Sequence, residues 1–564
     1  MNDYPRLSIR KPVLDAGVLL LLAVVAIAAH SPFRREALNM LHADYAPIWT
    51  TAEEISRGKW SVFAFDMHYA GVVLTCVRAI VLKTASIISN DSAFLWKTEA
   101  GFSFGLIPAL LAWAAYFTLR ISFSRPSAFA AALLVSLGTR YLAGYLHNDV
   151  YTLNLFFGFF VLGYRVKHRF PFMELSSGKL CTIAAFSGLL FYNSRITVIP
   201  LAVLWLPPPE YWRPALAYFI PKDQISLYLS RIALAFLILF LYLEIFGTTL
   251  GIFFDRRVLL NSPPNLAIAG IFMTVVATRN GALRIFLNHR RRFFIAAFAF
   301  LAGFLPEILH WIHFGGIPPR SLEQTRNIPE MMDVIGKIPS LLAEIFAVPE
   351  DGWAVASRIL WLTGIVGLIG FPRRDRRLQE AALLFALGLV AFVRFQNYAG
   401  LTPRYLLPVV PSLCFGAAWT FDHAFKKRVG AIVVSLLLVA HATALYSERV
   451  ALAREAADSH RWETKQEVIQ VFRKAGVRVV GSNDYWFTNE LSVASEMNPV
   501  FFLMEGAGLV HSSALDYWSK DSVVGIVLNM PAPSPDRLTV RGENLKIRAI
   551  GSKGGRFFYL GTRE

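Results

Sequence analysis

Cysteine is scarce in this sequence, and so are the patterns that would indicate a metal site. The chain has 564 residues and three cysteines, Cys76, Cys181 and Cys414, which lie far apart in apolar segments. Such spacing gives neither a disulfide framework nor a cysteine-based metal site. We find no other metal-ligand constellation, and we therefore predict no required metal and no cofactor.

The sequence also lacks internal repeats, low-complexity tracts and charge within most of its apolar runs. Hydrophobic residues make up 55% of the chain, and its mean hydropathy is +0.46. A soluble domain has too little interior to bury that much apolar surface, so the composition predicts a polytopic membrane protein. The net charge of +17 comes from short basic clusters between apolar runs. This distribution favours topology signals and contacts with membrane lipids over nucleic-acid binding.

Apolar runs of near-spanning length predict an α-helical membrane protein with about thirteen transmembrane helices. The N-terminal run follows three basic residues but has no convincing cleavage site, so we expect a retained first span. Another run, 68–88, is interrupted by Arg78 and Lys83, and we expect a helix at the interface or against the bundle. The thirteen runs are 13–30, 100–120, 127–146, 149–164, 179–193, 196–206, 228–249, 264–279, 293–313, 357–371, 379–396, 404–421 and 429–446.

Basic residues between these runs predict the topology. With a cytoplasmic N-terminus, all five clusters fall on the cytoplasmic side, as the positive-inside rule requires. The outside then holds a first external loop at 31–99, the corners 147–149, 193–195 and 397–403, the loops 250–263 and 314–356, and everything after 446. The clusters are Arg120 with Arg125; Arg165, Lys167 and Arg169; Arg290, Arg291 and Arg292; Arg373, Arg374, Arg376 and Arg377; and Lys426, Lys427 and Arg428.

The last part of the chain differs in character, which divides the sequence into a membrane domain at 1–446 and a tail at 447–564. The tail alternates polar, helix-compatible stretches with the strand-like runs "VRVVG", "PVFFLM" and "VVGIVLN". A closing hairpin is indicated by "RLTVRGENLKIRAI" followed by "RFFYLG". This pattern predicts a small α/β domain outside the membrane.

The first external loop contains a well-patterned acidic helix in "HADYAPIWTTAEEISRGKW". A helix over 44–57 begins at Asp44 and ends before Gly58, a typical stop. Asp44 could serve only as the N-cap, or it could do proton chemistry at the rim of a membrane cavity. An apolar stripe at helical spacing lies beside the acidic residues and comprises Tyr45, Ile48, Trp49, Ala52 and Ile55.

Several short motifs together resemble the GT-C glycosyltransferases, which include the protein O-mannosyltransferases and the lipid A aminoarabinose transferases. An acidic residue after the first span, followed by a helix ending in "GKW", resembles their first external loop. The segment "LHNDVYTLNLFFGFFVLGYR" resembles their second external corner. The segment "GLLFYNSRITVIPLAVLWL" resembles their helical pair that a cationic residue interrupts. "PRYLLPVVP" resembles their late Arg-Tyr corner. The repeated "DYW" is not the oligosaccharyltransferase signature, so that branch is set aside.

The resemblance implies that a sugar moves from a polyprenyl-phosphate donor to an acceptor hydroxyl on a glycan, lipid or protein. The donor lipid is then a substrate rather than a cofactor. Asp44 and Asp149 are the candidate catalytic carboxylates. Asp44 is followed by Tyr45, where O-mannosyltransferases have a second acid, so Asp149 or Glu53 is left as the partner acid. His147 is a further supporting candidate, although His147 and Asp149 also fit an ordinary polar corner.

Cations near the outer face are the candidates for binding the donor phosphate. Arg195 and Arg404 are both predicted there, with Tyr405 beside the second. The guanidinium fork of an arginine matches phosphate oxygens in two places. The alternative is that each arginine anchors its helix by reaching lipid headgroups.

Two other functions remain open from the sequence. A transporter or flippase of a lipid-linked glycan would favour charges within several spans and two similar halves. A non-catalytic scaffold that binds partners through its tail is the third possibility. The absence of a retention signal favours the bacterial inner membrane, with the active site and the tail facing the periplasm or exterior.

The basic clusters generate a prediction about the tail. We expect a reporter fused after Glu564 to be active if it works only in the periplasm, because all five clusters agree with a cytoplasmic N-terminus. Activity measured in intact cells checks this. Fluorescence from a reporter that folds only in the cytoplasm would reverse the topology.

Overall fold

The structure of the chain is a computed structural model. It describes residues 12–36, 52–53, 55–58, 73–138, 149–168, 175–193, 200, 204, 235, 282–314, 322–324, 328–346, 354–370, 375–397, 403–459, 462–484, 488, 491, 494–495, 498–504, 518, 520–532, 534, 536–540, 543–553 and 555–563.

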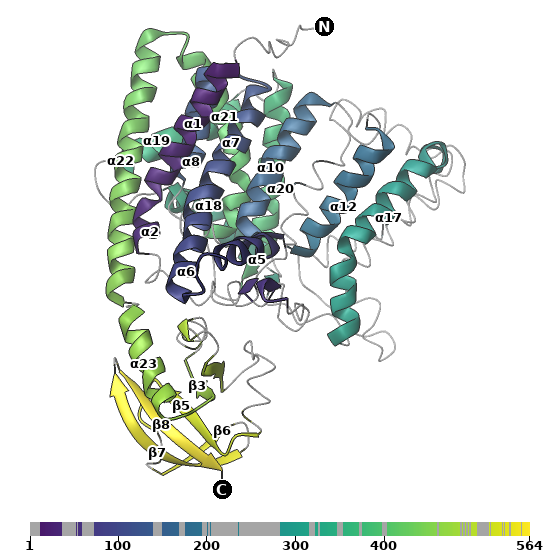
Figure 1. The fold of residues 1–564 in the computed structure, drawn as a ribbon. Helices are drawn as coiled ribbons and strands as arrows, with labels where there is room; N and C mark the ends of the chain where they lie inside the picture. Colours follow the sequence, from purple (N-terminus) through teal and green to yellow (C-terminus); the bar gives the residue numbers. More distant parts are fainter. Residues whose placement is uncertain are drawn as a thin grey trace.

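Most of the described chain is helical, and the helices form a bundle from which the tail extends (Figure 1). Most of the long helices coincide with an apolar run of the sequence, because a backbone in an apolar medium must satisfy its hydrogen bonds within the segment. The helix α18 is an exception: it lies within the predicted external loop 314–356, and its residues Val334 and Leu341 are buried in the main cluster of the bundle. The helices are α1 (Pro12–Ala29), α2 (Ser31–Arg35), α5 (Val73–Ala85), α6 (Ser92–Gly101), η2 (Phe102–Leu106), α7 (Ile107–Arg120), α8 (Arg125–Leu137), α10 (Asp149–Lys167), α12 (Ser177–Asn193), α17 (Ala282–Phe314), α18 (Ile328–Phe346), α19 (Ala354–Gly370), α20 (Arg376–Arg394), η4 (Pro403–Val409), α21 (Val410–Ala424), α22 (Arg428–Ser459) and α23 (Trp462–Lys474).

Among the described residues, two helical stretches are long and apolar enough to cross a membrane. They are Ala93–Arg120, which joins α6, η2 and α7, and Arg428–Glu455 of α22. Residues such as Val429, Leu436 and Val439 leave an exposed apolar side on α22. An exposed apolar surface of this length suits lipid better than water. The count of about thirteen spans stays a prediction.

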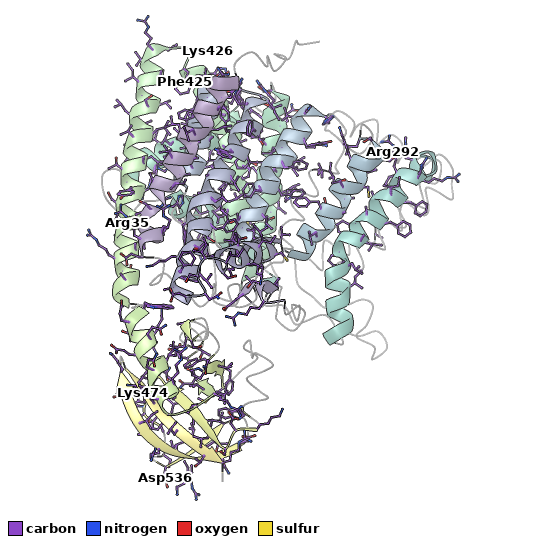
Figure 2. The ribbon with its side chains drawn as sticks, viewed as in Figure 1. Arg35, Arg292, Phe425, Lys426, Lys474 and Asp536 are labelled. Carbon is purple, nitrogen blue, oxygen red and sulfur yellow. The ribbon has the colours of Figure 1, made fainter. Side chains whose placement is uncertain are left out.

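The bundle has two distinct ends. We call the end at which the chain starts the N-terminal end, and the opposite end the tail-side end. Figure 2 shows Arg292 and Lys426 toward the N-terminal end, and Lys474 and Asp536 in the tail on the opposite side. Arg377 at the start of α20 donates a hydrogen bond to Ser122 O in the connection between α7 and α8, so these two segments meet at the N-terminal end.

The basic clusters gather at the N-terminal end, as the predicted topology requires. Asp422 near the end of α21 accepts from Ser124 N–H at 3.1 Å, so the α7–α8 and α21–α22 connections meet there. Arg125 is paired with Asp15 of α1 at 2.8 Å, which places the start of α8 beside the start of α1. Arg169, Arg373 and Arg374 lie outside the described residues. Which side of a membrane this end occupies stays a prediction.

A buried ion pair joins α10 to α20. Arg165 donates to both carboxylate oxygens of Glu380 at 2.9 to 3.0 Å, and both side chains are fully buried. Both residues lie near the ends of their helices, at the N-terminal end of the bundle. A buried charge is tolerated only when it is paired and hydrogen-bonded, and a two-pronged arginine–carboxylate contact meets that condition.

Glycines bring other helix pairs into backbone contact. A Cβ on Gly188 of α12 would overlap Phe300 O of α17, and one on Gly303 would overlap Ala185 O in the reverse direction. A Cβ on Gly364 of α19 would come within 2.6 Å of Leu413 O on α21. Small residues let helices approach closely, which is how helices associate where lipid and side chain are equally apolar.

The helix α5 lies crosswise to the bundle at its tail-side end (Figure 1). It packs against α6, and its buried residues include Ala79, Leu82 and Ala85. The sequence-based expectation of a helix that packs against the bundle rather than crossing it is confirmed for Val73–Ala85. Residues 68–72 lie outside the described chain.

The tail contains one six-stranded sheet with strand order β4-β3-β5-β8-β7-β6. The three strands β4, β3 and β5 are parallel, and β5, β8, β7 and β6 pair antiparallel. The predicted strand runs and the closing hairpin of β7 and β8 are confirmed. The strands are β3 (Val479–Ser482), β4 (Val500–Leu503), β5 (Val523–Leu528), β6 (Arg537–Val540), β7 (Glu543–Lys553) and β8 (Arg556–Arg563).

The helix α22 runs without a break across residue 446, the predicted domain boundary, and ends at Ser459. One continuous helix therefore runs from the bundle toward the tail (Figure 1). The division at 446 and 447 itself stays a prediction.

The direction of β5 follows from its pairing with β8. The start of β5 lies beside the end of β8, since Val523 pairs with Thr562. Because the C-terminus lies at the far side of the tail, β5 ends on the side that faces the bundle (Figure 1).

The buried pair generates a stability prediction. We expect Arg165→Met to destabilise the protein by about 3–5 kcal/mol, because Glu380 is left as an unpaired buried charge. The double variant Arg165→Met, Glu380→Leu should recover much of that loss. Thermal unfolding in detergent measures both. Equal melting temperatures for the single variant and the wild type would show that the pair contributes nothing.

Candidate functional site

The candidate site residues that the structure describes lie at the tail-side end of the bundle. Asp149 is the first residue of α10. Arg404 and Tyr405 lie in η4, which leads into α21 and packs against α10, α18 and α20. The structure thus brings the segment of Arg404 and the helix that Asp149 begins into contact. Asp44, His147 and Arg195 lie outside the described residues, so their roles stay predictions.

A short strand pair positions the corner that precedes η4. The strand β2 (Phe395–Asn397) follows α20 directly and pairs antiparallel with β1 (Leu322–Gln324). Leu322 is opposite Asn397 in this register. The pairing links the predicted external loop 314–356 to the corner 397–403, so two predicted external segments meet beside η4.

The end of the predicted acidic helix is confirmed. Gly58 has a φ of +80°, a left-handed conformation that favours glycine, and its N–H donates to Ile55 O at 2.9 Å. Ala52 and Ile55 are buried in a cluster with residues of α5 and α6, which confirms the described part of the predicted apolar stripe. The stripe therefore packs this helix against the tail-side end of the bundle.

Glu53 on the same helix forms an ion pair with Arg57, one turn later. The Arg57 side chain is 54% exposed, so water screens the pair. The Glu53 side chain is only 12% exposed, so the screening is partial; fully exposed pairs at this spacing contribute about 0.3–0.5 kcal/mol to stability. This contact gives Glu53 a local role, and its predicted supporting role in chemistry stays a prediction.

A buried polar group that the sequence-based analysis missed joins α5 to α6. Arg78 Nε donates to Glu99 Oε1 at 2.9 Å, and Ser103 Oγ donates to the same oxygen at 2.6 Å. Both charged side chains are almost completely buried. The sequence does mark Arg78 as unusual, because this residue interrupts an apolar run. Its partner Glu99 lies 21 positions away, so no local pattern could identify the pair.

The helix geometry changes directly after Glu99. Residues Phe102–Leu106 form the π-helix η2 between α6 and α7, and Ser103 lies on it. Short π-helical segments are frequent at functional sites, because the wider turn redirects side chains and backbone carbonyls. Here the wider turn accompanies a carboxylate that is held at the tail-side end of a spanning stretch.

Arg449 of α22 fixes where two candidate segments begin. Its guanidinium donates to Ala29 O at 2.8 Å and also to Leu137 O. These carbonyls close the ends of α1 and α8, where the last carbonyl groups of a helix have no partner within it. Arg449 itself is 2% exposed. The loop that carries Asp44 starts after α1, and the segment that carries His147 and Asp149 starts after α8.

The described candidate residues include a carboxylate, Asp149, and a cation, Arg404, on elements at the tail-side end of the bundle. Within the described ranges, no group of three His, Cys, Asp or Glu residues could hold a metal ion. The expectation that no metal is required stays a prediction.

Comparisons with known proteins identify the fold. No protein-family model matches the chain, and no curated protein sequence matches it. Among solved structures, apo ArnT from Cupriavidus metallidurans is 12% identical, with a TM-score of 0.51 over 97% of this chain and 98% of that chain. ArnT is a GT-C superfamily member. The GT-C fold predicted from the sequence motifs is therefore confirmed over nearly the whole chain.

Two further structures are similar at lower scores. ArnT from Cupriavidus metallidurans bound to undecaprenyl phosphate is 13% identical, with a TM-score of 0.45 over 97% of each chain. Archaeal oligosaccharyltransferase AglB from Archaeoglobus fulgidus, in complex with an inhibitory peptide and a dolichol-phosphate, is 13% identical. Its TM-score is 0.46 over 92% of this chain and 69% of that chain.

Proposed function

We propose that this chain, which has the GT-C fold, is a membrane glycosyltransferase that moves a sugar from a polyprenyl-phosphate donor to an acceptor hydroxyl. The fold match to ArnT over nearly both whole chains carries the proposal. The motifs that resemble GT-C enzymes add to it, because the described ones, at Asp149 and Arg404, begin neighbouring elements at one end of the bundle.

We place the reaction at the tail-side end of the bundle. The five basic clusters gather at the other end, and the positive-inside rule assigns that other end to the cytoplasm. The candidate residues and the tail then face the periplasm or exterior of a bacterial inner membrane. The acceptor is a glycan, a lipid or a protein that reaches this face.

The chemistry requires a base and a cationic site. An acceptor hydroxyl is a poor nucleophile at neutral pH, so a positioned carboxylate that takes its proton accelerates the reaction by roughly 10² to 10⁴. Asp44 is the proposed base, with Asp149 or Glu53 as the partner acid and His147 in support. The leaving lipid phosphate is dianionic in character and is stabilised by cations, for which Arg404 and Arg195 are proposed with Tyr405 nearby.

The packing at the tail-side end favours a positioned base in the first external loop. The helix that ends at Gly58 is held by buried Ala52 and Ile55, and Arg449 holds the end of α1 from which the loop starts. Catalysis needs its reacting groups held to within fractions of an ångström, which loops achieve only when both ends are fixed.

The first functional prediction concerns Asp44. Asn caps a helix as well as Asp does but has no basic oxygen, so Asp44→Asn separates the two roles. We expect transfer of labelled sugar from a polyprenyl-phosphate donor in membranes to fall by roughly 10² to 10⁴, at matched protein level.

The control for Asp44→Asn is Glu53→Gln on the same helix. This variant removes the charge that pairs with Arg57, and we expect a milder effect on transfer than for Asp44→Asn. Near-normal transfer by Asp44→Asn would reject Asp44 as the base, and Asp149→Asn would be the next variant to measure.

The second functional prediction concerns the donor phosphate. We expect Arg404→Ala to weaken use of the lipid donor more than Arg404→Lys, because a lysine keeps the charge and loses only the planar fork. The same order is expected at Arg195. The dependence of turnover on donor concentration measures the effect. Unchanged turnover in both alanine variants would return the two arginines to the role of interface anchors.

A further inference from the structure

A groove opens between α7, α10 and α12 at the N-terminal end, far from the candidate site residues. Its volume is about 690 Å³. One part of its lining is apolar and includes Phe117 of α7 and Phe160 of α10, whose side chains are 54% and 40% exposed. The basic part comprises Lys167 at the end of α10, His168 directly after it, and Lys179 in the first turn of α12.

The walls of the groove are fixed by contacts with other helices. Arg165, two residues before Lys167, holds α10 to α20 through its buried pair with Glu380. The opposite wall, α12, is in backbone contact with α17 at Gly188 and Gly303. Arg292 of α17 also donates to Leu175 O at 3.0 Å, just before α12 begins. Each wall of the groove is therefore supported by a neighbouring helix, α10 by α20 and α12 by α17.

The two lysines lie on opposite rims of the groove and are both exposed. In the part of the chain that the structure describes, neither Lys167 nor Lys179 is paired with a carboxylate. The first turn of α12 adds the positive end of a helix dipole near Lys179. The polar part of the groove is thus complementary to an anion, and the apolar part continues from it along α7 and α10.

We propose that this groove binds one anionic glycerophospholipid from the leaflet at the N-terminal end. The headgroup phosphate lies between Lys167 and Lys179, and an acyl chain lies against Phe117 and Phe160. A free phosphate would leave these exposed aromatic side chains uncovered, whereas a phospholipid matches both parts of the lining. The site is separate from glycosyl transfer, and it requires only that the chain is embedded in a membrane.

The charge is tested with the double variant Lys167→Gln, Lys179→Gln. The full chain is purified in detergent, and bound phosphatidylglycerol and phosphatidylcholine are quantified by native mass spectrometry. We expect phosphatidylglycerol affinity to fall roughly tenfold to thirtyfold, the effect of removing two lysines from an anionic lipid contact, while phosphatidylcholine binding is unchanged. The matched control is Lys426→Gln, Lys427→Gln, which removes two exposed lysines from the same end but outside the groove.

The shape is tested with Gly178→Trp. Gly178 lines the groove, and a Cβ there meets no atom within 4 Å, so a large side chain fits at this position without displacing the backbone. We expect this variant to lose phosphatidylglycerol binding while it elutes from gel filtration as the wild type does. Gly370→Trp at the end of α19 also meets no atom within 4 Å, lies outside the groove and serves as its control.

Three outcomes would overturn the proposal. Unchanged phosphatidylglycerol affinity in the double lysine variant would show that the lysines only reach toward bulk headgroups. Unchanged binding in Gly178→Trp would place the lipid elsewhere. Displacement of phosphatidylglycerol by undecaprenyl phosphate at equal concentration would assign the groove to a polyprenyl lipid instead.

Discussion

The arrangement of the tail-side end depends on one buried guanidinium. Arg449 donates to the last carbonyls of α1 and α8, so α22 holds the points from which both candidate external segments start. Burying a cation in an apolar bundle is costly unless polar groups surround it. The unpaired carbonyls at helix C-termini carry partial negative charge and are suitable partners. The helix α22 itself extends beyond Arg449 to Ser459, toward the tail.

Two kinds of contact decide which helices are neighbours in this bundle. Ion pairs act near helix ends, as between Arg165 and Glu380, and glycine contacts act between helix backbones, as between Gly188 of α12 and Phe300 of α17. Apolar side chains alone would not select partners, because lipid tails solvate them equally well. Specific pairing therefore requires either charge complementarity or close backbone approach, and the described helices use both.

The two ends of the bundle differ in chemistry, and the proposed reaction uses only one of them. The N-terminal end gathers basic residues and the groove beside Lys167, which are features that contact lipid headgroups. The tail-side end has the crosswise helix α5, the π-helix η2 and the buried Arg78–Glu99 pair. Irregular elements within a bundle tend to mark where chemistry occurs, since regular helices already satisfy their own backbone.

The sequence by itself determined many of the elements of this protein, and only the tertiary structure decided their partners. Apolar run length predicted α1 and α22, alternation predicted the tail strands, and Gly58 marked a helix end, because these signals are local. The GT-C fold was also predicted from short motifs, and the site residues followed from that resemblance. The partner of Arg165 lies 215 positions away, and Arg449 binds backbone carbonyls, which have no sequence signature. Such contacts arise only when distant segments meet in space, so no local pattern could have predicted them.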